Sequence, residues 1–192
     1  MSNETTECEQ GLVARANHDP EAFRQLYNLY LPRVYTYVGY RVGVQQEAED
    51  LVSQIFLKVV EELARFQWRH AHSFAAWLFR IAHNVVANFH RDASRAGTSL
   101  TLDALPTIAA NELLPEDTLL RKELFAQLHL IVNELPTRRR EALCLRYFAG
   151  LRNQEIAAVL GIDERTVASI LSRALADLRV RFGTAETNES PS

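Results

Sequence analysis

The chain has 192 residues, of which 47% are hydrophobic and 23% charged, and its formal net charge is −3. This composition excludes a wholly disordered chain, and no apolar run approaches the roughly 18–20 residues that a membrane-spanning helix needs. Cys8 and Cys144 are far apart in the sequence and form neither a disulfide framework nor a zinc-ligand pattern. We therefore expect a cytoplasmic protein without membrane insertion, metal or cofactor, and the polar, acidic start does not resemble a signal peptide.

The charge is unevenly distributed along the chain. Residues 1–95 carry 10 basic and 11 acidic side chains, residues 96–117 carry 4 acidic and no basic ones, and residues 118–183 carry 11 basic and 7 acidic ones. A basic second half is a first indication of modular DNA binding. Ordinary scatter of surface charge explains the same asymmetry equally well.

Apolar residues recur at helical spacing and nowhere alternate with the period of a strand, so we expect an all-α protein. Asp19 before Pro20 predicts a helix start. Pro32 predicts an interruption, with a second run over 34–42 that stops near Gly43.

Two longer helices are expected to follow. One apolar stripe over residues 45–66 predicts a helix of about six turns. Ser73 is a suitable cap for the next helix, whose stripe extends to Phe89, and Gly97 is a plausible stop.

Residues 97–117 combine Gly, Pro, Ser and Thr with four acids, and predict an extended acidic linker. Fully extended, about 21 residues span roughly 70 Å, or about two turns of B-DNA. After the linker we expect a helix over 118–135, a break at Pro136, a helix to about residue 148 and a helix pair over 153–182. The predicted organisation is an N-terminal segment (1–16), a helical domain (17–96), the linker (97–117), a second helical domain (118–183) and a disordered tail (184–192).

The sharpest local pattern is a helix-turn-helix over residues 153–172. Ile156, Ala157 and Leu160 give the first helix a small apolar face, Gly161 lies where a tight turn needs positive φ, and Asp163 is placed to cap the second helix. In this interpretation the second helix enters the major groove. A generic pair of packed helices is the alternative.

The segment around that pattern, LPTRRREALCLRYFAGLRNQEIAAVLGIDERTVASILSRALADLR, resembles the C-terminal region of bacterial RNA polymerase sigma factors. DPEAFRQLYNLYLPRVYTYV, EAEDLVSQIFLKV and SFAAWLFRIAHNVVANFHRD resemble the core-binding and promoter-melting region of the extracytoplasmic-function (ECF) group. The resemblance covers about residues 17–182. It implies a fold of two small helical domains joined by a linker. It also implies that the protein is not an enzyme but binds core RNA polymerase and promoter DNA, and that an anti-sigma protein holds it inactive. It also implies that the acidic linker enters a nucleic-acid channel as a mimic.

The resemblance implies that one polar helix face docks on the clamp helices of the largest polymerase subunit. Asp50 and Gln54 are neighbours on one face because they are four residues apart. The implied docking residues are Asp50, Gln54, Glu47, Phe56 and Lys58. Ile55 stands where the family usually has Glu, which removes one polar contact.

The next helix and the loop before it resemble the part that recognises and opens the minus-ten element. An aromatic ring with nearby cations and amides suits the capture of unstacked bases. The implied residues are Trp68, Arg69, Arg80, His83, Asn84, Ala87, Asn88, His90, Arg91 and Arg95. Trp68 is also explained as a half-buried surface aromatic, and Trp77 as a core residue. Asn88 and His90 replace the family's usual Asp and Arg.

The helix-turn-helix is implied to read the minus-thirty-five element. The implied residues are Arg165, Thr166, Ala168, Ser169, Ser172, Arg173, Arg152 and Arg146, and Arg138, Arg139 and Arg140 are further candidates for phosphate contacts. Ala168 and Ile170 stand where the family often has basic residues, so we expect an unusual upstream element or weaker dependence on it.

Three other classes of protein remain open. A stand-alone helix-turn-helix regulator explains residues 118–182 but not Asp50 and Gln54, and a helical adaptor would bind polymerase without directing initiation. An enzyme is disfavoured: His90-Arg91-Asp92 resembles a kinase catalytic loop without its Gly-rich loop, and His70 and His72 have no further metal ligands around them.

Overall fold

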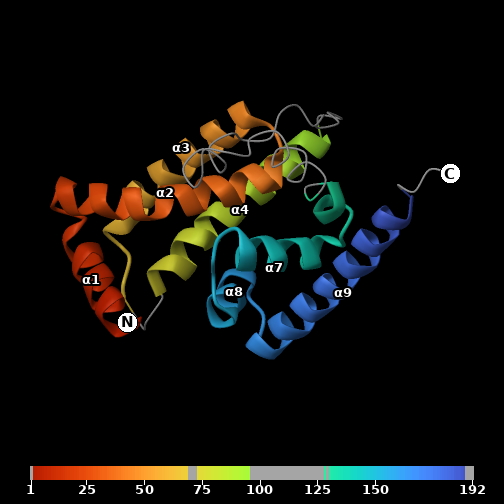
Figure 1. Cartoon of the computed structure of the whole chain (residues 1–192). Coiled ribbons are helices and arrows are strands. Elements are labelled where there is room, and N and C mark those ends of the chain that lie inside the picture. The colour runs from red at the N-terminus through yellow and green to blue at the C-terminus, as the bar shows by residue number, and fades with distance from the viewer. Residues whose placement is uncertain (1, 69–72, 96–127, 129, 189–192) are drawn as a thin grey trace, which may run out of the picture.

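The computed structural model describes residues 2–68, 73–95, 128 and 130–188. Within these ranges the chain forms helices and turns and no strand, which confirms the expected all-α class. Four helices form what we call the N-terminal module: α1 (Ser2–Arg15), α2 (Pro20–Val42), α3 (Gln45–Leu63) and α4 (Ser73–Arg95). Three more form the C-terminal module: α7 (Thr137–Tyr147), α8 (Asn153–Leu160) and α9 (Glu164–Asn188) (Figure 1). The predicted linker and most of the helix predicted over 118–135 lie outside the described residues.

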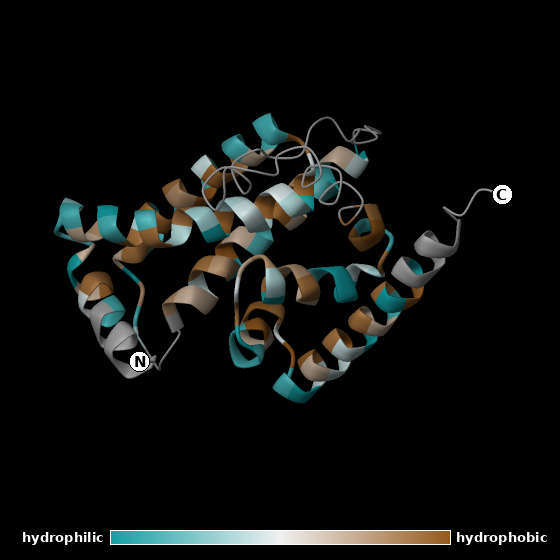
Figure 2. Ribbon diagram, viewed as in Figure 1, coloured by the Kyte–Doolittle hydropathy of each residue, from teal (hydrophilic) through white to brown (hydrophobic). Residues whose placement is uncertain are grey.

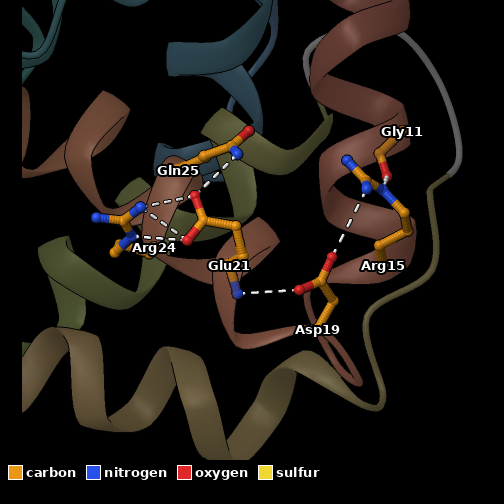
Figure 3. Close-up of polar contacts among 6 residues, drawn as sticks. All are labelled: Gly11, Arg15, Asp19, Glu21, Arg24 and Gln25. Carbon is orange, nitrogen blue, oxygen red and sulfur yellow. Dashed lines mark hydrogen bonds and ion pairs between the residues drawn. The ribbon is translucent and has the colours of Figure 1, made fainter.

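The turn between α1 and α2 is fixed by Asp19, as its sequence context predicts (Figure 3). Its carboxylate accepts a hydrogen bond of 3.0 Å from the Glu21 backbone N–H. It also lies 3.6 Å from the guanidinium of Arg15, whose Nε donates to the Gly11 carbonyl. An N-cap carboxylate satisfies an otherwise unbonded N–H of the first helical turn. The cap therefore holds α1 against the start of α2, and α1 is part of the packed N-terminal module.

The predicted interruption at Pro32 is wrong, because α2 continues through it to Val42. Proline removes one N–H and leaves the carbonyl four residues earlier, on Asn28, without its helical partner. Asn28 and Pro32 both lie on the exposed face of α2, so water can satisfy that carbonyl. The predicted stop is confirmed, since Gly43 has a φ of 79° and its N–H bonds to the Gly39 carbonyl.

The N-terminal core lies between α2, α3 and α4, and aromatic rings fill much of it. Tyr37 and Phe79 are fully buried and meet edge to face, with ring centroids 5.8 Å apart. Tyr30 meets Phe74 in the same way, and its hydroxyl donates to Glu9 of α1 over 2.6 Å. Figure 2 shows hydrophobic and hydrophilic stretches following one another along these helices.

The C-terminal module is built around the predicted helix-turn-helix. Gly161 ends α8 with a φ of 66°, and the Asp163 carboxylate accepts from the Thr166 N–H over 2.8 Å. Val167 and Ala174 of α9 are fully buried against α7 and α8. The predicted turn at Gly161 and the predicted cap at Asp163 are both confirmed.

The tail predicted to be disordered from residue 184 is wrong in its first part, since α9 extends through Gly183 to Asn188. Adding residues to an existing helix avoids the cost of nucleation. Ala185 and Glu186 favour helix, and they are enough to carry it past the glycine.

The two modules lie against each other in one body (Figure 1). α8 packs along α4, and α7 contacts α2. A single cluster of buried residues runs through both modules. The sequence predicts two domains joined by a linker, but it does not predict this direct contact between them.

Gly161→Ala is expected to lower the free energy of unfolding by about 1 kcal/mol, because a Cβ is disfavoured at positive φ. No neighbouring atom lies within 4 Å of the position where the Cβ would stand, so the cost comes from the backbone conformation alone. Urea denaturation measures the change. Gly11→Ala is the matched control: Gly11 lies inside α1 with equal space around it, and alanine should stabilise the helix by about 0.5–1 kcal/mol.

Candidate polymerase-docking and nucleic-acid surfaces

α3 separates its apolar and polar residues cleanly onto two faces. Asp50, Gln54, Glu47 and Lys58 are all exposed on the side away from the core. We call the exposed face that contains Asp50 and Gln54 the α3 face. These four polar side chains of the α3 face are accessible to solvent, which a docking surface requires.

Phe56 is the exception among the five docking candidates. It is only 7% exposed, and its ring packs on Tyr27 with centroids 4.5 Å apart. Phe56 therefore supports the α3 face from beneath and does not lie on it. Ile55 is fully buried as well, so no contact with a partner is lost through the absence of Glu at that position.

The α3 face also holds a residue that the sequence analysis missed. Leu57 is 60% exposed and lies seven residues after Asp50, hence on the same side of the helix. An apolar residue in a polar surface is typical of the centre of a protein interface. The signal was present in the sequence, since Leu57 falls outside the apolar stripe of α3.

The polar stripe predicted on α4 contains both exposed and half-buried residues. Five residues of the stripe are exposed, namely Arg80, Asn84, Asn88, Arg91 and Arg95. Three of these five have local partners. Arg91 donates to the Asn88 side chain over 2.9 Å, and Arg95 pairs with Asp92 at 3.8 Å. His83, Ala87 and His90 are half-buried.

The two histidines of the stripe face charged groups of the other helices. Burial, together with the cations of Arg41 and Arg140, lowers the pKa of His90 to about 4. Burial also lowers the pKa of His83, with Glu141 opposing the shift and Arg41 adding to it. Both rings are therefore neutral at physiological pH. Arg140 and Glu141 belong to α7, so the C-terminal module shapes the electrostatics of α4.

The loop before α4 is described as far as Trp68, and Arg69 lies outside the described residues. Trp68 is half-buried and meets Phe66 edge to face, with centroids 6.1 Å apart. Both rings line a cavity of about 330 Å³, together with Asn17 and His18 of the α1–α2 turn. Trp77 is also half-buried, with its ring 5.0 Å from Phe66.

The first turns of α9 present the predicted reading face to solvent. Five of its residues are exposed: Arg165, Ala168, Ser169, Ser172 and Arg173. Thr166 is half-buried, and its backbone N–H donates to the Asp163 cap. Exposed polar residues at the start of the second helix are what base-edge contacts in a major groove require. Ile170 is half-buried and packs against the core.

Several arginines predicted to meet phosphates already have partners inside the protein. Arg139 pairs with Asp177 of α9, and Arg140 is half-buried and donates to the Asn133 carbonyl over 3.1 Å. Arg146 is exposed but donates to the Leu151 carbonyl. Arg138 and Arg152 are exposed, and the Arg152 N–H donates to the buried Glu155 carboxylate. Arg139 and Arg140 thus brace the C-terminal module.

The triplet that resembles a kinase catalytic loop lies in a helix. His90, Arg91 and Asp92 lie within the continuous helix α4. In the ranges the structure describes, no three His, Cys, Asp or Glu side chains gather as metal ligands; His70 and His72 lie outside those ranges. Cys144 is a fully buried thiol, and burial raises its pKa to about 12.

No helix in the described ranges is at once long enough and apolar enough to cross a membrane.

The fold is an all-helical protein of two modules, with a helix-turn-helix exposed in one module and a polar helix face exposed in the other. Two family profiles match the chain in order: Sigma-70 region 2 over residues 26–96 and Sigma-70 region 4 over residues 125–178. The first spans most of the N-terminal module. The second contains the helix-turn-helix.

Two curated relatives are similar over most of this chain. The ECF RNA polymerase sigma factor BldN of Streptomyces coelicolor is 35% identical over 168 residues, which cover 87% of this chain and 63% of BldN. The chain therefore spans less than two thirds of that relative. The RNA polymerase sigma-H factor of Pseudomonas aeruginosa is 32% identical over 178 residues, covering 88% of this chain and 91% of the relative.

A solved structure has the same fold. The sigma factor RpoE of Bartonella quintana, crystallised with the anti-sigma factor NepR, superposes with a TM-score of 0.66 at 24% identity, covering 82% of this chain and 94% of that one. The chain belongs to the bacterial RNA polymerase sigma factors, in their extracytoplasmic-function group.

Replacing Arg165 and Arg173 with alanine is expected to weaken binding of promoter-length duplex DNA. A lost bidentate base contact costs about 1–3 kcal/mol and relaxes specificity, whereas a lost phosphate contact weakens all sequences alike and lowers the salt slope by about one. Fluorescence anisotropy at several salt concentrations separates the two. Arg179→Ala is the control, because Arg179 is exposed on the same helix but far from its N-terminus. An equal effect of Arg179→Ala would locate the reading face elsewhere.

Proposed function

We propose that this chain binds core RNA polymerase, directs it to a defined set of promoters, assists melting of the start region and leaves after initiation. It would act in the cytoplasm, where polymerase and DNA are. The observation that carries the proposal is the presence in one chain of an exposed polar face on α3 and an exposed helix-turn-helix on α8 and α9.

The α3 face is proposed to dock on the polymerase. Asp50, Gln54, Glu47 and Lys58 supply charge and hydrogen bonds, and these are all exposed. Leu57 supplies an apolar centre, 60% exposed, around which such contacts exclude water. Phe56 keeps the helix in place through its contact with Tyr27.

α4 and the loop before it are proposed to hold the opened non-template strand. Opening DNA costs about 1.4 kcal/mol per base-pair step on average, and capture of unstacked bases offsets this cost. The exposed Arg80, Asn84, Asn88 and Arg91 supply cations and amides, and aromatic rings such as Trp68 offer stacking surfaces. Arg69, Arg95, His83, Ala87 and His90 complete the proposed minus-ten set.

The start of α9 is proposed to read the upstream promoter element in the major groove, through Arg165, Thr166, Ala168, Ser169, Ser172 and Arg173. Arg152 at the start of α8 and Arg146 at the end of α7 would meet phosphates. Because Ala168 and Ile170 carry no charge, we expect an unusual upstream element or weak dependence on it.

An anti-sigma protein is proposed as a further partner. The RpoE structure with the same fold was solved with one. On this chain such a partner would compete for the α3 face or hold the two modules together.

Mapping of transcript starts tests the function. Purified chain, core RNA polymerase and fragmented genomic DNA of the source bacterium are incubated with nucleotides, and the 5′ ends of the transcripts are sequenced. We expect discrete starts that require both proteins. Binding of DNA without core association would favour a stand-alone regulator, and core association without starts would favour an adaptor.

A further inference from the structure

Five buried side-chain atoms on α2, α4 and α7 have no hydrogen-bond partner in the part of the chain that the structure describes. They are the Tyr37 hydroxyl, Nε and one terminal nitrogen of Arg41, His83 Nδ1 and Arg140 Nε. Buried polar groups of native proteins are nearly always hydrogen-bonded, so each exception needs a physical reason. We call these four residues the buried basic cluster.

The members of the buried basic cluster act on one another. Tyr37 and Arg41 are four residues apart, hence neighbours on one face of α2. Burial lowers the pKa of His83 and of Arg140, and the charge of Arg41 adds to both shifts. Burial also raises the pKa of Tyr37 far above its ordinary value, with Arg41 opposing the shift. Tyr37 therefore keeps its proton and remains a hydrogen-bond donor.

The buried basic cluster has an excess of positive charge. Arg41 is only 5% exposed, and its guanidinium lies 3.7 Å from the Glu141 carboxylate, which is too far for a hydrogen bond. Arg140 is half-buried and donates to the Asn133 carbonyl, a neutral group. Two guanidinium groups thus share one carboxylate. A buried charge that is incompletely paired is costly.

A bound anion supplies both the acceptors and the negative charge that the cluster needs. A buried water molecule would accept hydrogen bonds but bring no charge. A carboxylate has two oxygens, whereas a tetrahedral oxyanion such as phosphate has four, which suits donors that come from three helices. Guanidinium groups also form short, charge-assisted hydrogen bonds with phosphate oxygens.

We propose that Tyr37, Arg41, His83 and Arg140 form a binding site for a small free oxyanion of the phosphate class. The two guanidinium groups supply the charge, and the Tyr37 hydroxyl and the Nδ1–H tautomer of His83 donate neutral hydrogen bonds. Arg41 is buried too deeply for a DNA backbone to reach it, so the ligand is a free ion. This inference goes beyond the proposed function and does not depend on it.

Titration of the full chain with inorganic phosphate tests the site. Isothermal titration calorimetry at constant ionic strength measures the affinity, and we expect one phosphate per chain. Thermal unfolding provides a second readout, because a ligand that binds only the folded state raises the midpoint as its concentration rises. Sodium chloride at the same ionic strength is the reference, since it screens charge without offering a tetrahedral set of acceptors.

Arg41→Gln removes the most buried cation of the cluster. It should weaken phosphate binding about tenfold or more, as expected for the loss of a charge-assisted hydrogen bond. Arg24→Gln is the matched control, because Arg24 is an exposed arginine of the same helix, and it should bind phosphate within about twofold of the wild type.

Glu141→Gln should have the opposite effect. It keeps the shape of the side chain and removes the carboxylate that lies beside Arg41, so phosphate binding should tighten about tenfold. A gain in affinity cannot come from a loss of structure, and it therefore separates a binding site from a merely structural cluster. Glu62→Gln, at an exposed acid of α3, is the control and should leave the affinity unchanged.

The site is overturned if the wild type binds no phosphate, if chloride stabilises it equally, or if Arg41→Gln and Arg24→Gln bind phosphate alike. Should Arg41→Gln fail to fold, Glu141→Gln decides alone. A labelled DNA without terminal phosphates tests the other source of phosphate. If Arg41→Gln abolishes binding of that DNA while free phosphate never binds, Arg41 contacts the DNA backbone and the free-ion site is wrong. Absence of transcript starts would refute only the proposed function.

Discussion

Phe79→Ala is expected to lower the free energy of unfolding by about 3–5 kcal/mol, the usual cost of truncating a buried phenylalanine. Phe79 has no exposed surface and meets the ring of Tyr37 edge to face. The Arg33 guanidinium also lies over its ring, 5.5 Å from the centroid. The cost is expected at the upper end of the range, because the cavity also removes the support of Arg33.

Urea denaturation followed by circular dichroism measures this change. Leu29→Ala is the control, since Leu29 is 48% exposed on α2 and exposed substitutions usually shift stability by less than about 0.5 kcal/mol. A loss below about 1 kcal/mol for Phe79→Ala would contradict the packing of α2 against α4 described here.

The same substitution links the core to the contact between modules. Arg33 lies over the rings of Tyr30 and Phe79 and donates to the Ala149 carbonyl of the C-terminal module. When Phe79 is truncated, Arg33 loses the surface that orients it. Below the unfolding transition, Phe79→Ala should therefore enlarge the radius of gyration.

Local signals in the sequence predicted the local structure well. The Asp19 cap, the Gly43 stop, the Gly161 turn and the Asp163 cap each depend on a few neighbouring residues, and the structure confirms all of them. The apolar stripe of α3 likewise predicted which of its residues are buried, because helical period alone determines the face.

The predictions that are wrong concern features that depend on solvent or on residues far away in the sequence. Pro32 is tolerated inside α2 because the carbonyl that it leaves without a helical partner lies on the exposed face of the helix. The residue pattern around Pro32 does not by itself show that this face is exposed. The helix through Gly183 depends on propagation from a helix already formed.

The candidate surfaces likewise combine features that follow from the local sequence with features that depend on distant residues. The exposed residues of the α3 face follow from helical period, but the charges that act on His83 and His90 include Glu141 and Arg140 of α7, about 50 residues further along the chain. Likewise the Arg139–Asp177 pair joins two helices, and it converts a candidate phosphate ligand into a structural brace. Contacts of this range leave no periodic trace in the sequence.

Replacing Asp50 and Gln54 together with alanine is expected to weaken binding to core RNA polymerase by about 2–4 kcal/mol, or roughly 30-fold to several hundred-fold in Kd. Both side chains are exposed, neighbouring and free of the apolar core. They sit beside the exposed Leu57, which would exclude water from their contacts and so strengthen them. The fold should be unaffected, since neither residue packs inside the protein.

Gel filtration and titration of labelled core polymerase measure the loss, and thermal unfolding checks that the variant is folded. Glu62→Ala is the control, since Glu62 is exposed on α3 but turned about a third of a circle away from Asp50. Leu57→Ala should weaken binding as well, without altering any charge. If the double variant binds as tightly as the wild type while Leu57→Ala does not, the contact is apolar and the polar pair only borders it. If all three bind equally, the polymerase meets a different face of the N-terminal module.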